Sequence, residues 1–144
     1  SPKLVGKFNV GYGVRDFTRG GDDDLIAVDG SFSYELTPKS SLQFGMSHDF
    51  GTSPQGVQQK NLTVNGSITT KIDEAWSTNI GASYRRIDYG TRTDDYFEGN
   101  LGATFIVNAN VRIVGAYVYR KYESDLAGSG FSNNVFSIGA NLRY

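Results

Sequence analysis

The sequence predicts an all-β fold, a single antiparallel up-and-down β-barrel of about eight strands over residues 1–144. Apolar and polar residues alternate along most of the chain, which is the period of a strand with one apolar face. The pattern also repeats at a nearly constant interval, because Val28, Val64, Leu101 and Ile138 are 36, 37 and 37 residues apart. An interval that holds two strands and two turns indicates a repeated hairpin.

The clearest strand pattern lies at the end of the chain, from Phe136 to Tyr144. Aromatic or aliphatic residues occupy every second position there, and Ser, Gly, Asn and Arg lie between them. A last strand that closes on Phe or Tyr resembles the C-terminal signal of bacterial outer-membrane β-barrels. The resemblance implies that the barrel assembly machinery recognises the chain through Phe136 to Tyr144.

The other strands follow from the same alternation and from the turn signals between them. The expected strands are residues 3–17, 25–36, 42–50, 61–69, 76–85, 97–107, 111–122 and the last stretch up to residue 144. All three Pro residues lie outside these strands, where no N–H donor is required. The seventh strand is the least regular, because its second face carries Val114, Ala116 and Val118.

Short and long connections are expected to alternate along the chain. The short turns are 37–40, 73–74 and 108–110, and the longer polar loops are 18–24, 51–59, 89–95 and 123–130. For the tightest turn, 108–110, we expect a left-handed Asn backbone. An even number of strands would bring the last strand beside the first, so that the sheet closes and has no free edge.

The two faces differ in side-chain size, and this difference predicts which face points into the barrel and which face points to its surroundings. The apolar face carries bulky Phe, Tyr, Val and Ile, whereas the polar face is rich in Gly, Ser, Asn and Thr. The interior of an eight-stranded barrel only just holds its side chains, so the small polar set fits inside and the bulky set outside. The sequence therefore predicts a transmembrane barrel in the bacterial outer membrane, with periplasmic termini and extracellular long loops.

Aromatic residues of the apolar face gather near the two ends of the strands. Those near the long loops are Tyr12, Phe50, Tyr84, Tyr89 and Tyr119, and those near the short turns are Tyr34, Phe44, Trp76, Phe105 and Tyr144. Such rings form belts at the two membrane surfaces, where one side of the ring meets lipid and its OH or NH meets water. The belts agree with a membrane barrel.

Three segments resemble the putative β-barrel porin 2 group: LTPKSSL at 36–42, YRR at 84–86 and YVYRKYESD at 117–125. Members of that group are generally longer than this chain, and some are linked to exopolysaccharide secretion. The resemblance leaves two interpretations of residues 1–144: a single short barrel domain, or the C-terminal hairpins of a larger barrel. It supplies no catalytic motif, so no enzyme activity is expected.

Charged residues on the polar face are expected to point into the lumen. They are Lys7, Arg15, Asp29, Glu35, Asp49, Lys71, Arg85, Glu98, Arg112, Arg120 and Arg143. In an eight-stranded barrel we expect these charges to pair and fill the lumen, because an unpaired buried charge is costly. The protein would then act structurally or through its loops. The alternative is a porin or an export-pore component for small solutes or exopolysaccharide, in which the same charges select solutes.

Few residues suggest other chemistry. Arg86 and Lys121 face outward near the long loops, where they could contact lipopolysaccharide phosphates or extend into water. Asp22–Asp24 lacks the ligand spacing of a calcium loop, and His48 diverges from Asp49. The chain has no Cys and a net charge of −1. From this composition we expect no metal site, no cofactor and no nucleic-acid partner. The expected partners are outer-membrane lipid, lipopolysaccharide and other barrel or envelope subunits.

Overall fold

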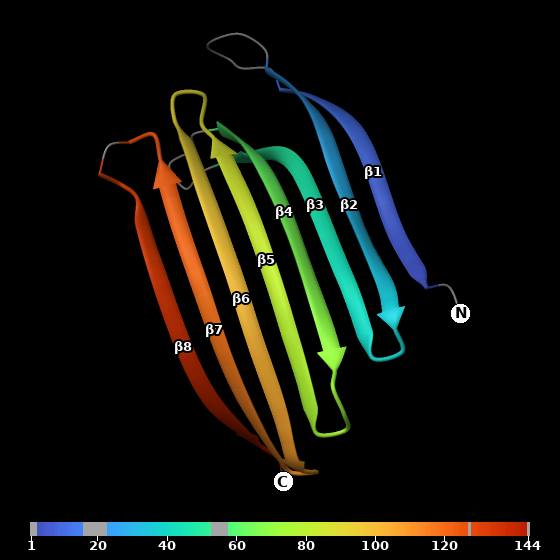
Figure 1. Cartoon of the computed structure of the whole chain (residues 1–144). Helices are drawn as coiled ribbons and strands as arrows, with labels where there is room; N and C mark the ends of the chain where they lie inside the picture. Colours follow the sequence, from blue (N-terminus) through green and yellow to red (C-terminus); the bar gives the residue numbers. More distant parts are fainter. Residues whose placement is uncertain (1–2, 16–22, 53–57, 127, 144) are drawn as a thin grey trace.

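The computed structural model describes residues 3–15, 23–52, 58–126 and 128–143, without the side chains of Arg15, Asp23 and Gln58. These residues form one antiparallel sheet in which eight strands follow one another in chain order (Figure 1). The strands are β1 Leu4–Arg15, β2 Asp23–Thr37, β3 Ser40–Thr52, β4 Gln58–Lys71, β5 Trp76–Asp88, β6 Thr93–Asn108, β7 Val111–Ser124 and β8 Phe131–Leu142. No helix in the described part of the chain is long and apolar enough to cross a membrane.

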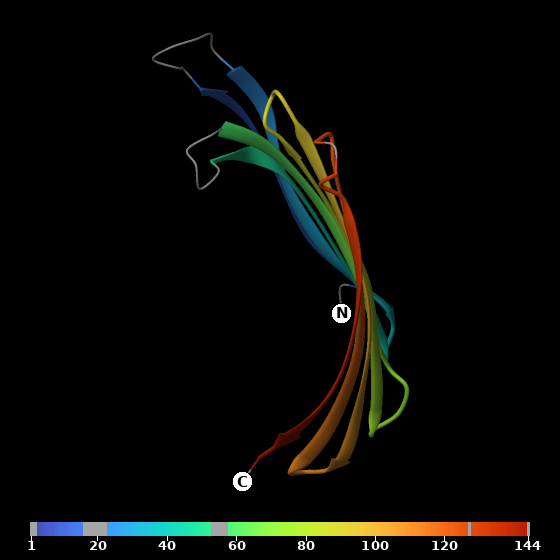
Figure 2. The same cartoon turned by 90° about the vertical axis from the view of Figure 1, so that its left-hand side faces the viewer.

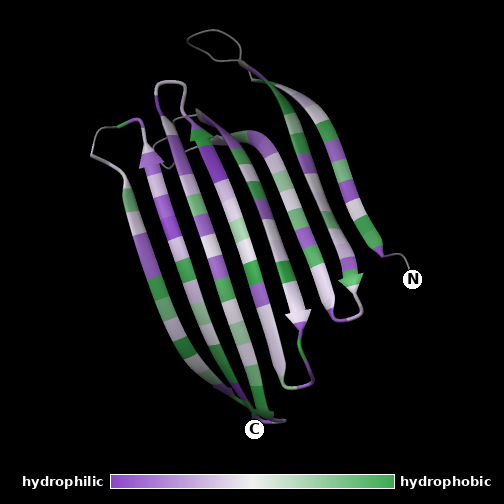
Figure 3. Cartoon of the chain, in the orientation of Figure 1, coloured by the Kyte–Doolittle hydropathy of each residue, from purple (hydrophilic) through white to green (hydrophobic). Residues whose placement is uncertain are grey.

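The strand pairing keeps the two faces separate across the whole sheet. One row of cross-strand partners runs from Ile68 through Ile80, Leu101 and Tyr117 to Phe136, so one face is apolar on five successive strands. Because neighbouring residues of a strand point to opposite faces, the residues between these positions form the polar face. Figure 3 shows the resulting bands of hydrophobic and hydrophilic residues along the strands. The predicted separation of apolar and polar residues onto two faces is confirmed.

Neither face of the sheet is covered by another layer. Within the described residues, Leu25, Ile87 and Asp94 are the only buried side chains. On the apolar face, by contrast, Phe136 is 79% exposed and Ile138 is 83% exposed. A soluble domain packs such a face against a second layer, and soluble monomers rarely expose a continuous apolar surface of this extent. We call this surface the apolar face. It carries Phe8, Phe32, Ile80, Leu101 and Phe136.

The number, direction and order of the strands are as predicted, but the eight strands do not close into a barrel in this structure. β1 pairs only with β2 and β8 only with β7, so the sheet has two free edges in the described residues. Figures 1 and 2 show an open, twisted and curved sheet with β1 and β8 at opposite sides. β1 begins and β8 ends at the side of the sheet that carries the short turns. Closure depends on what meets the two edges, which local alternation does not specify.

Several strands extend further than the sequence predicted. Thr93–Asn108 includes Asp95, and Val111–Ser124 includes Glu123, although both acidic residues were expected in loops. Asp95 forms an ion pair with Arg86 on the neighbouring strand β5, and Glu123 forms one with Lys121 on its own strand. The strand pairing continues through both charged positions. The connections 72–75 and 89–92 consequently have the same length, four residues, so the alternation of short and long connections is incomplete.

The tightest turn also differs from the expectation. No non-glycine residue in the described ranges has a positive φ, so the turn at 108–110 does not use a left-handed Asn. Instead the side-chain Oδ1 of Asn108 accepts a hydrogen bond from the Asn110 N–H at 2.9 Å, and the register shifts next to the turn, between Ile106 and Asn108. The side chain thus stabilises the reversal that a left-handed backbone would otherwise provide.

The β4–β5 turn is fixed by one carboxylate, and its removal should lower the stability of the sheet. Asp73 accepts hydrogen bonds from the backbone N–H groups of Ala75 at 2.8 Å and Trp76 at 2.7 Å. We expect Asp73→Ala to lower the free energy of unfolding by about 1 kcal/mol, the usual contribution of such a bond at an exposed turn. Urea unfolding in micelles, followed by fluorescence of Trp76, the single Trp of the chain, measures the change.

Glu74 provides the matched control, because it is exposed in the same turn and has no hydrogen bond or ion pair within the described residues. Glu74→Ala should leave the unfolding midpoint unchanged. Equal effects of the two substitutions would show that the Asp73 hydrogen bonds do not hold the turn.

The polar face as the candidate functional site

The polar face collects the charged residues that the sequence placed in the lumen. The cross-strand register puts Lys7, Asp29, Glu35, Asp49, Lys71, Arg85, Glu98, Arg112 and Arg120 on this face. Arg143 lies just beyond β8, where its backbone N–H donates to the carbonyl of Asn110 at 2.9 Å. The side chain of Arg15 lies outside the described residues.

Only a small part of this set is paired. Among the described residues, Arg120 and Glu98 form the one ion pair that joins two of these charges, with Nε and Oε2 2.6 Å apart. Asn9 donates to Asp29 at 3.4 Å. Lys7, Asp29, Glu35, Asp49 and Arg112 are exposed. The structure thus brings together Glu98 and Arg120 and leaves most of the other charges at the open surface, so a fully paired lumen network stays a prediction.

Three aromatic rings form a ladder across β6, β7 and β8 on the polar face. Tyr96 and Tyr122 are cross-strand partners with ring centroids 4.6 Å apart, and Tyr122 and Phe131 are partners with centroids 5.5 Å apart. The Arg85 guanidinium, on β5, lies 4.6 Å from the centroid of Tyr96. Aromatic and cation–π contacts at these distances are attractive. We call the four residues Arg85, Tyr96, Tyr122 and Phe131 the aromatic ladder.

A second row of polar residues runs parallel to the aromatic ladder. Ser83 pairs with Glu98, Glu98 with Arg120, and Arg120 with Asn133, so the row crosses β5 to β8 in the same order. Each residue of this row lies two positions away from the ladder residue of the same strand, a distance of about 7 Å along the strand. A hollow of about 410 Å³ lies at this place and is lined by residues of both rows, among them Ser83, Arg85, Tyr96, Glu98, Arg120 and Tyr122.

Next to the ladder, Asp94 ties the β5–β6 loop to the end of β7. Its side chain is 2% exposed and accepts hydrogen bonds from Arg92 Nη2 at 2.9 Å and Ser124 Oγ at 2.6 Å. The Arg92 guanidinium also lies 4.6 Å from the Tyr89 ring centroid. Burial is the largest single influence on the pKa of Arg92 and lowers it, but the charges and hydrogen bonds of Asp94 and Tyr89 together raise the pKa, so the net shift is upward. The buried carboxylate is thus matched by a permanent cation.

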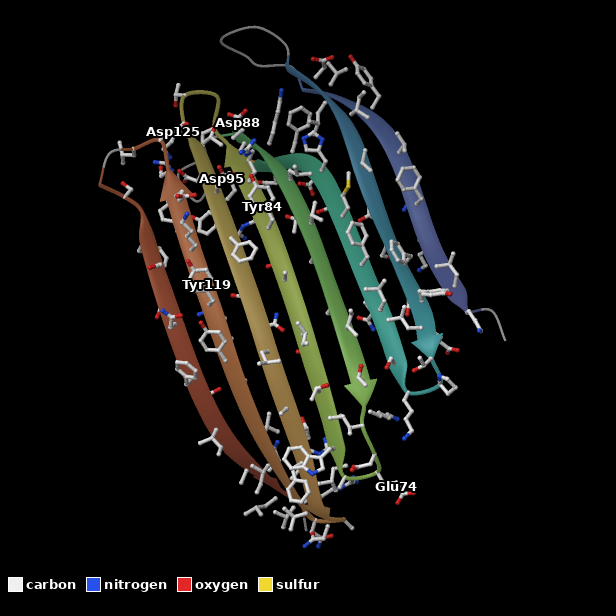
Figure 4. The ribbon with its side chains drawn as sticks, viewed as in Figure 1. Glu74, Tyr84, Asp88, Asp95, Tyr119 and Asp125 are labelled. Atoms are coloured by element: carbon white, nitrogen blue, oxygen red, sulfur yellow. The ribbon has the colours of Figure 1, made fainter. Side chains whose placement is uncertain are left out.

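Arg86 and Lys121, which were expected to face outward, lie on the apolar face and have carboxylate partners. Arg86 binds Asp95 through Nε–Oδ1 at 2.8 Å and Nη2–Oδ2 at 3.2 Å, and the Tyr84 hydroxyl donates to the same carboxylate at 2.6 Å. Lys121 pairs with Glu123 at 2.7 Å. Figure 4 shows Tyr84 and Asp95 toward the end of the sheet that carries the β5–β6 loop, with Glu74 at the opposite end. Contact of Arg86 and Lys121 with lipopolysaccharide stays a prediction.

The described residues bring no catalytic or metal-binding group together. His48 pairs across strands with Leu62, and its neighbour Asp49 lies on the other face with Asn61, so imidazole and carboxylate diverge. The His48 ring nitrogen Nδ1 is 3.0 Å from the carbonyl oxygen of Ile26. Asp24 accepts a hydrogen bond from the Tyr12 hydroxyl at 3.2 Å, while Asp22 lies outside the described residues. Within those residues no group of three or more His, Cys, Asp or Glu could hold a metal ion.

The aromatic ladder was not predicted from the sequence, and neither was the cluster of Asp94, Arg92 and Ser124, which we call the Asp94 cluster. Tyr96 and Phe131 lie at the edges of segments that were expected to be loops, so the alternating pattern was not followed to them. Continuing the polar positions by one step from Glu98, Arg120 and Asn133 reaches Tyr96, Tyr122 and Phe131, and this signal could have found the ladder. Asp94 carries no such signal, because its contacts come from Arg92 in the preceding loop and Ser124 at the end of another strand.

Residues 56–144 match the model of the family described as Putative beta-barrel porin 2. The matched segment begins just before β4 and includes all of β4 to β8, and therefore the aromatic ladder and the Asp94 cluster. A comparison with curated proteins finds no match.

Removal of the Asp94 carboxylate should loosen the β5–β6 loop. We expect Asp94→Ala to raise the rate of tryptic cleavage after Arg92 severalfold in the intact protein in micelles, because the guanidinium loses its partner and the loop its anchor to Ser124. Mass spectrometry of the fragments over time measures the rate at this one peptide bond.

Glu123→Ala is the control for this experiment, because it also removes a carboxylate beside a basic residue, Lys121, near the same end of the sheet but outside the cluster. It should leave cleavage after Arg92 unchanged. A rate in Asp94→Ala equal to that of the unsubstituted protein would mean that the cluster does not restrain the loop.

Proposed function

Because the chain belongs to the family described as Putative beta-barrel porin 2, we propose that it is an integral β-barrel protein of the bacterial outer membrane whose polar face lines a water-filled passage for solutes. The family membership supports a porin-like barrel. The passage, the membrane and the direction of the two faces are parts of the proposal. The single observation that carries it is the open sheet, with an uncovered apolar face on one side and an uncovered charged face on the other.

The apolar face supports location in a lipid bilayer. Its central residues are largely exposed, such as Ile80 at 58% and Leu101 at 50%. The backbone N–H and C=O groups between these strands are paired by the antiparallel strand pairing. A strand surface that shows bulky apolar side chains and satisfies its backbone hydrogen bonds within the sheet is the form in which β structure crosses a membrane.

Aromatic contacts at both ends of the apolar face support the same location. Trp76 and Phe105 stack with centroids 4.6 Å apart at the end with the short turns. Near the other end, Tyr12 and Tyr84 donate their hydroxyls to carboxylates. Rings placed between lipid and water, with the polar atom on a hydrophilic partner, are typical of membrane interfaces. We infer that the two belts mark the two surfaces of the bilayer.

The free edges favour a passage over a filled barrel. A closed barrel of about eight strands has room only for its own side chains, and the filled-lumen hypothesis depended on that limit. Here β1 and β8 do not pair, so further strands or another subunit must meet the edges if the barrel is to close in lipid. A barrel with more strands is wider and leaves an aqueous channel. The exposed charges Lys7, Asp29, Asp49 and Arg112 then border water and need no partner.

Lipopolysaccharide and the barrel assembly machinery are further parts of the proposal. Arg86 and Lys121 lie at the end of the apolar face where lipopolysaccharide phosphates would be found. The free edge of β8 is available to the barrel assembly machinery, although Tyr144 lies outside the described residues. The diverging side chains of His48 and Asp49 support a non-enzymatic role.

The assignment of the faces predicts the effect of a lysine on each. We expect Ile80→Lys to destabilise the protein in lipid bilayers by about 2–4 kcal/mol, the cost of a cation on the lipid side near the midplane of a barrel. Asn79→Lys, one residue earlier and on the polar face, is the matched control and should cost little. Guanidinium unfolding from liposomes, followed by Trp76 fluorescence, measures both.

Equal destabilisation by the two lysines, or a larger effect at Asn79, would contradict the placement of the apolar face against lipid.

The passage itself is tested by electrical recording. We expect the native protein, purified from its membrane with any strands or subunits that complete the barrel, to produce steady single-channel steps in planar bilayers. Heat-denatured protein is the control for leakage. A protein that inserts, as shown by protease protection of its strands, but passes no current would instead have a filled lumen and would act through its loops.

A further inference from the structure

The pairing of β2 with β3 stops before the two strands end. Its last pair at the loop end is Val28 with His48, although β2 begins at Asp23 and β3 continues to Thr52. The β1–β2 and β3–β4 pairings, by contrast, continue to the ends of these strands. Figure 1 shows the end of β3 bending away from β2 toward β4. We call the place where residues 23–27 and 49–52 separate the β2–β3 fork.

A side-chain hydrogen bond links the two strands at the base of the fork. If the register continued beyond Val28 and His48, Ile26 would face Phe50. Instead the carbonyl oxygen of Ile26 lies 3.0 Å from Nδ1 of His48. A carbonyl only accepts hydrogen bonds, so Nδ1 carries the proton and donates it. The single histidine of the chain, to which the proposed function gives no role, thus connects β3 to β2 where their backbone pairing ends.

Apolar side chains occupy the polar side of the fork. Gly13 and its cross-strand partner Leu25 lie at positions of the polar face, and Leu25 is 6% exposed. A Cβ atom at Gly13 would lie 3.5 Å from the Phe50 ring, so this ring reaches the polar face, although Phe50 was expected in the belt of the apolar face. Ile26, on the apolar face, is 62% exposed. Apolar surface therefore continues through the fork from one face of the sheet to the other.

The fork lies at the level of the aromatic belt near the long loops. Ile26 is the cross-strand partner of Tyr12, whose hydroxyl donates to Asp24 at 3.2 Å. An interrupted strand pairing is costly in the hydrocarbon of a bilayer, but at its surface water and lipid head groups can bond the free backbone groups. A break in the wall is therefore tolerated at this level, where the chain of an amphipathic molecule enters lipid and its head stays in water.

The charges around the fork limit the head group. Asp24 and Asp49 are exposed on the two strands that separate, and Lys60, with Nζ 6.0 Å from the Phe50 ring centroid, balances only one of them. An anionic head would meet this excess of carboxylates unfavourably. The chemistry that fits is one aliphatic chain with a neutral polar head.

We propose that the β2–β3 fork is a lateral opening in the barrel wall, through which such a neutral single-chain amphipath moves between the lumen and the lipid layer on the loop side. The inference rests on the proposed function, because it requires lipid against the apolar face and a lumen at the polar face. His48 is the latch, since its bond to Ile26 keeps the fork narrow. Phe50 and Leu25 contact the aliphatic chain as it passes.

Photo-crosslinking in liposomes tests the opening with the native protein and any strands or subunits that complete its barrel. The probe is a lauroyl monoacylglycerol with a diazirine at the end of its chain, and mass spectrometry maps the labelled residues. We expect labelling of Ile80, which faces lipid, and of Leu25, which lies on the polar face at the fork. Asn79, on the polar face away from the fork, should stay unlabelled.

Variants of His48 test the latch. His48→Leu keeps a bulky side chain but removes the donor, and it should raise labelling of Leu25 severalfold, because loss of the hydrogen bond to Ile26 favours the open fork. His48→Asn is the matched control. Its amide nitrogen takes the place of Nδ1 and can donate the same bond, so labelling should stay near the native level.

A reducible cross-link tests the opening from the opposite direction. Ala27→Cys and Asp49→Cys, at positions that would face each other if the pairing continued, can be joined by a short bis-methanethiosulfonate linker. The linker should suppress labelling of Leu25 until a reductant is added. The same linker between Asn65→Cys and Ser83→Cys, a cross-strand pair of β4 and β5 on the polar face, is the control and should have no effect.

The inference is overturned if Leu25 is labelled no more than Asn79, or if labelling of Leu25 is unchanged by His48→Leu or by the linker across the fork. Absence of labelling at Ile80 would instead contradict the placement of the apolar face against lipid, so the failure of the proposed function is distinguishable from the failure of the lateral opening.

Discussion

The structure depends on the antiparallel register of seven strand pairs, which shifts only beside two turns in the described residues, at Glu35–Thr37 and Ile106–Asn108. Each pairing satisfies backbone N–H and C=O groups between strands, and it also fixes which side chains share a face. A slip of one residue in any pair would move every side chain of a strand to the other face. The register therefore determines at once the apolar face, the polar face, the aromatic ladder and the ion pairs at the loop end of the sheet.

The two faces make different demands on their surroundings. Among the described residues nothing packs on the apolar face, and in the proposed function a lipid bilayer covers it. The polar face exposes charges of both signs, which are favourable only beside water. Because the eight strands do not enclose the polar face in this structure, the proposed water-filled passage depends on what meets the free edges of β1 and β8. The hydrogen bonds of Asp94 with Ser124 and of Asp95 with Tyr84 stabilise the loop end of β5, β6 and β7.

Much of the fold could be predicted from the sequence because alternation is a local property. The positions of Phe44, Ile80 and Leu101 on one face, and of Asn79 and Glu98 on the other, follow from period-two patterning alone. Closure could not be predicted, because it depends on what meets the edges of β1 and β8. The ion pairs of Asp95 and Glu123 were missed because polar residues at a strand end resemble a loop until their cross-strand partners are known. The ladder was missed for the same reason, since Tyr96 and Phe131 adjoin segments of that kind.

The most direct test of the account is the environment of alternate residues along one central strand. The chain has no Cys, so single cysteines from Asn79 to Tyr84 in β5 can carry a spin label without further changes. In liposomes, labels at Ile80, Ala82 and Tyr84 should collide mainly with oxygen, which concentrates in lipid. Labels at Asn79, Gly81 and Ser83 should collide mainly with a water-soluble nickel complex. The opposite phase, or no alternation, would contradict the assignment of the apolar face to lipid and of the polar face to water.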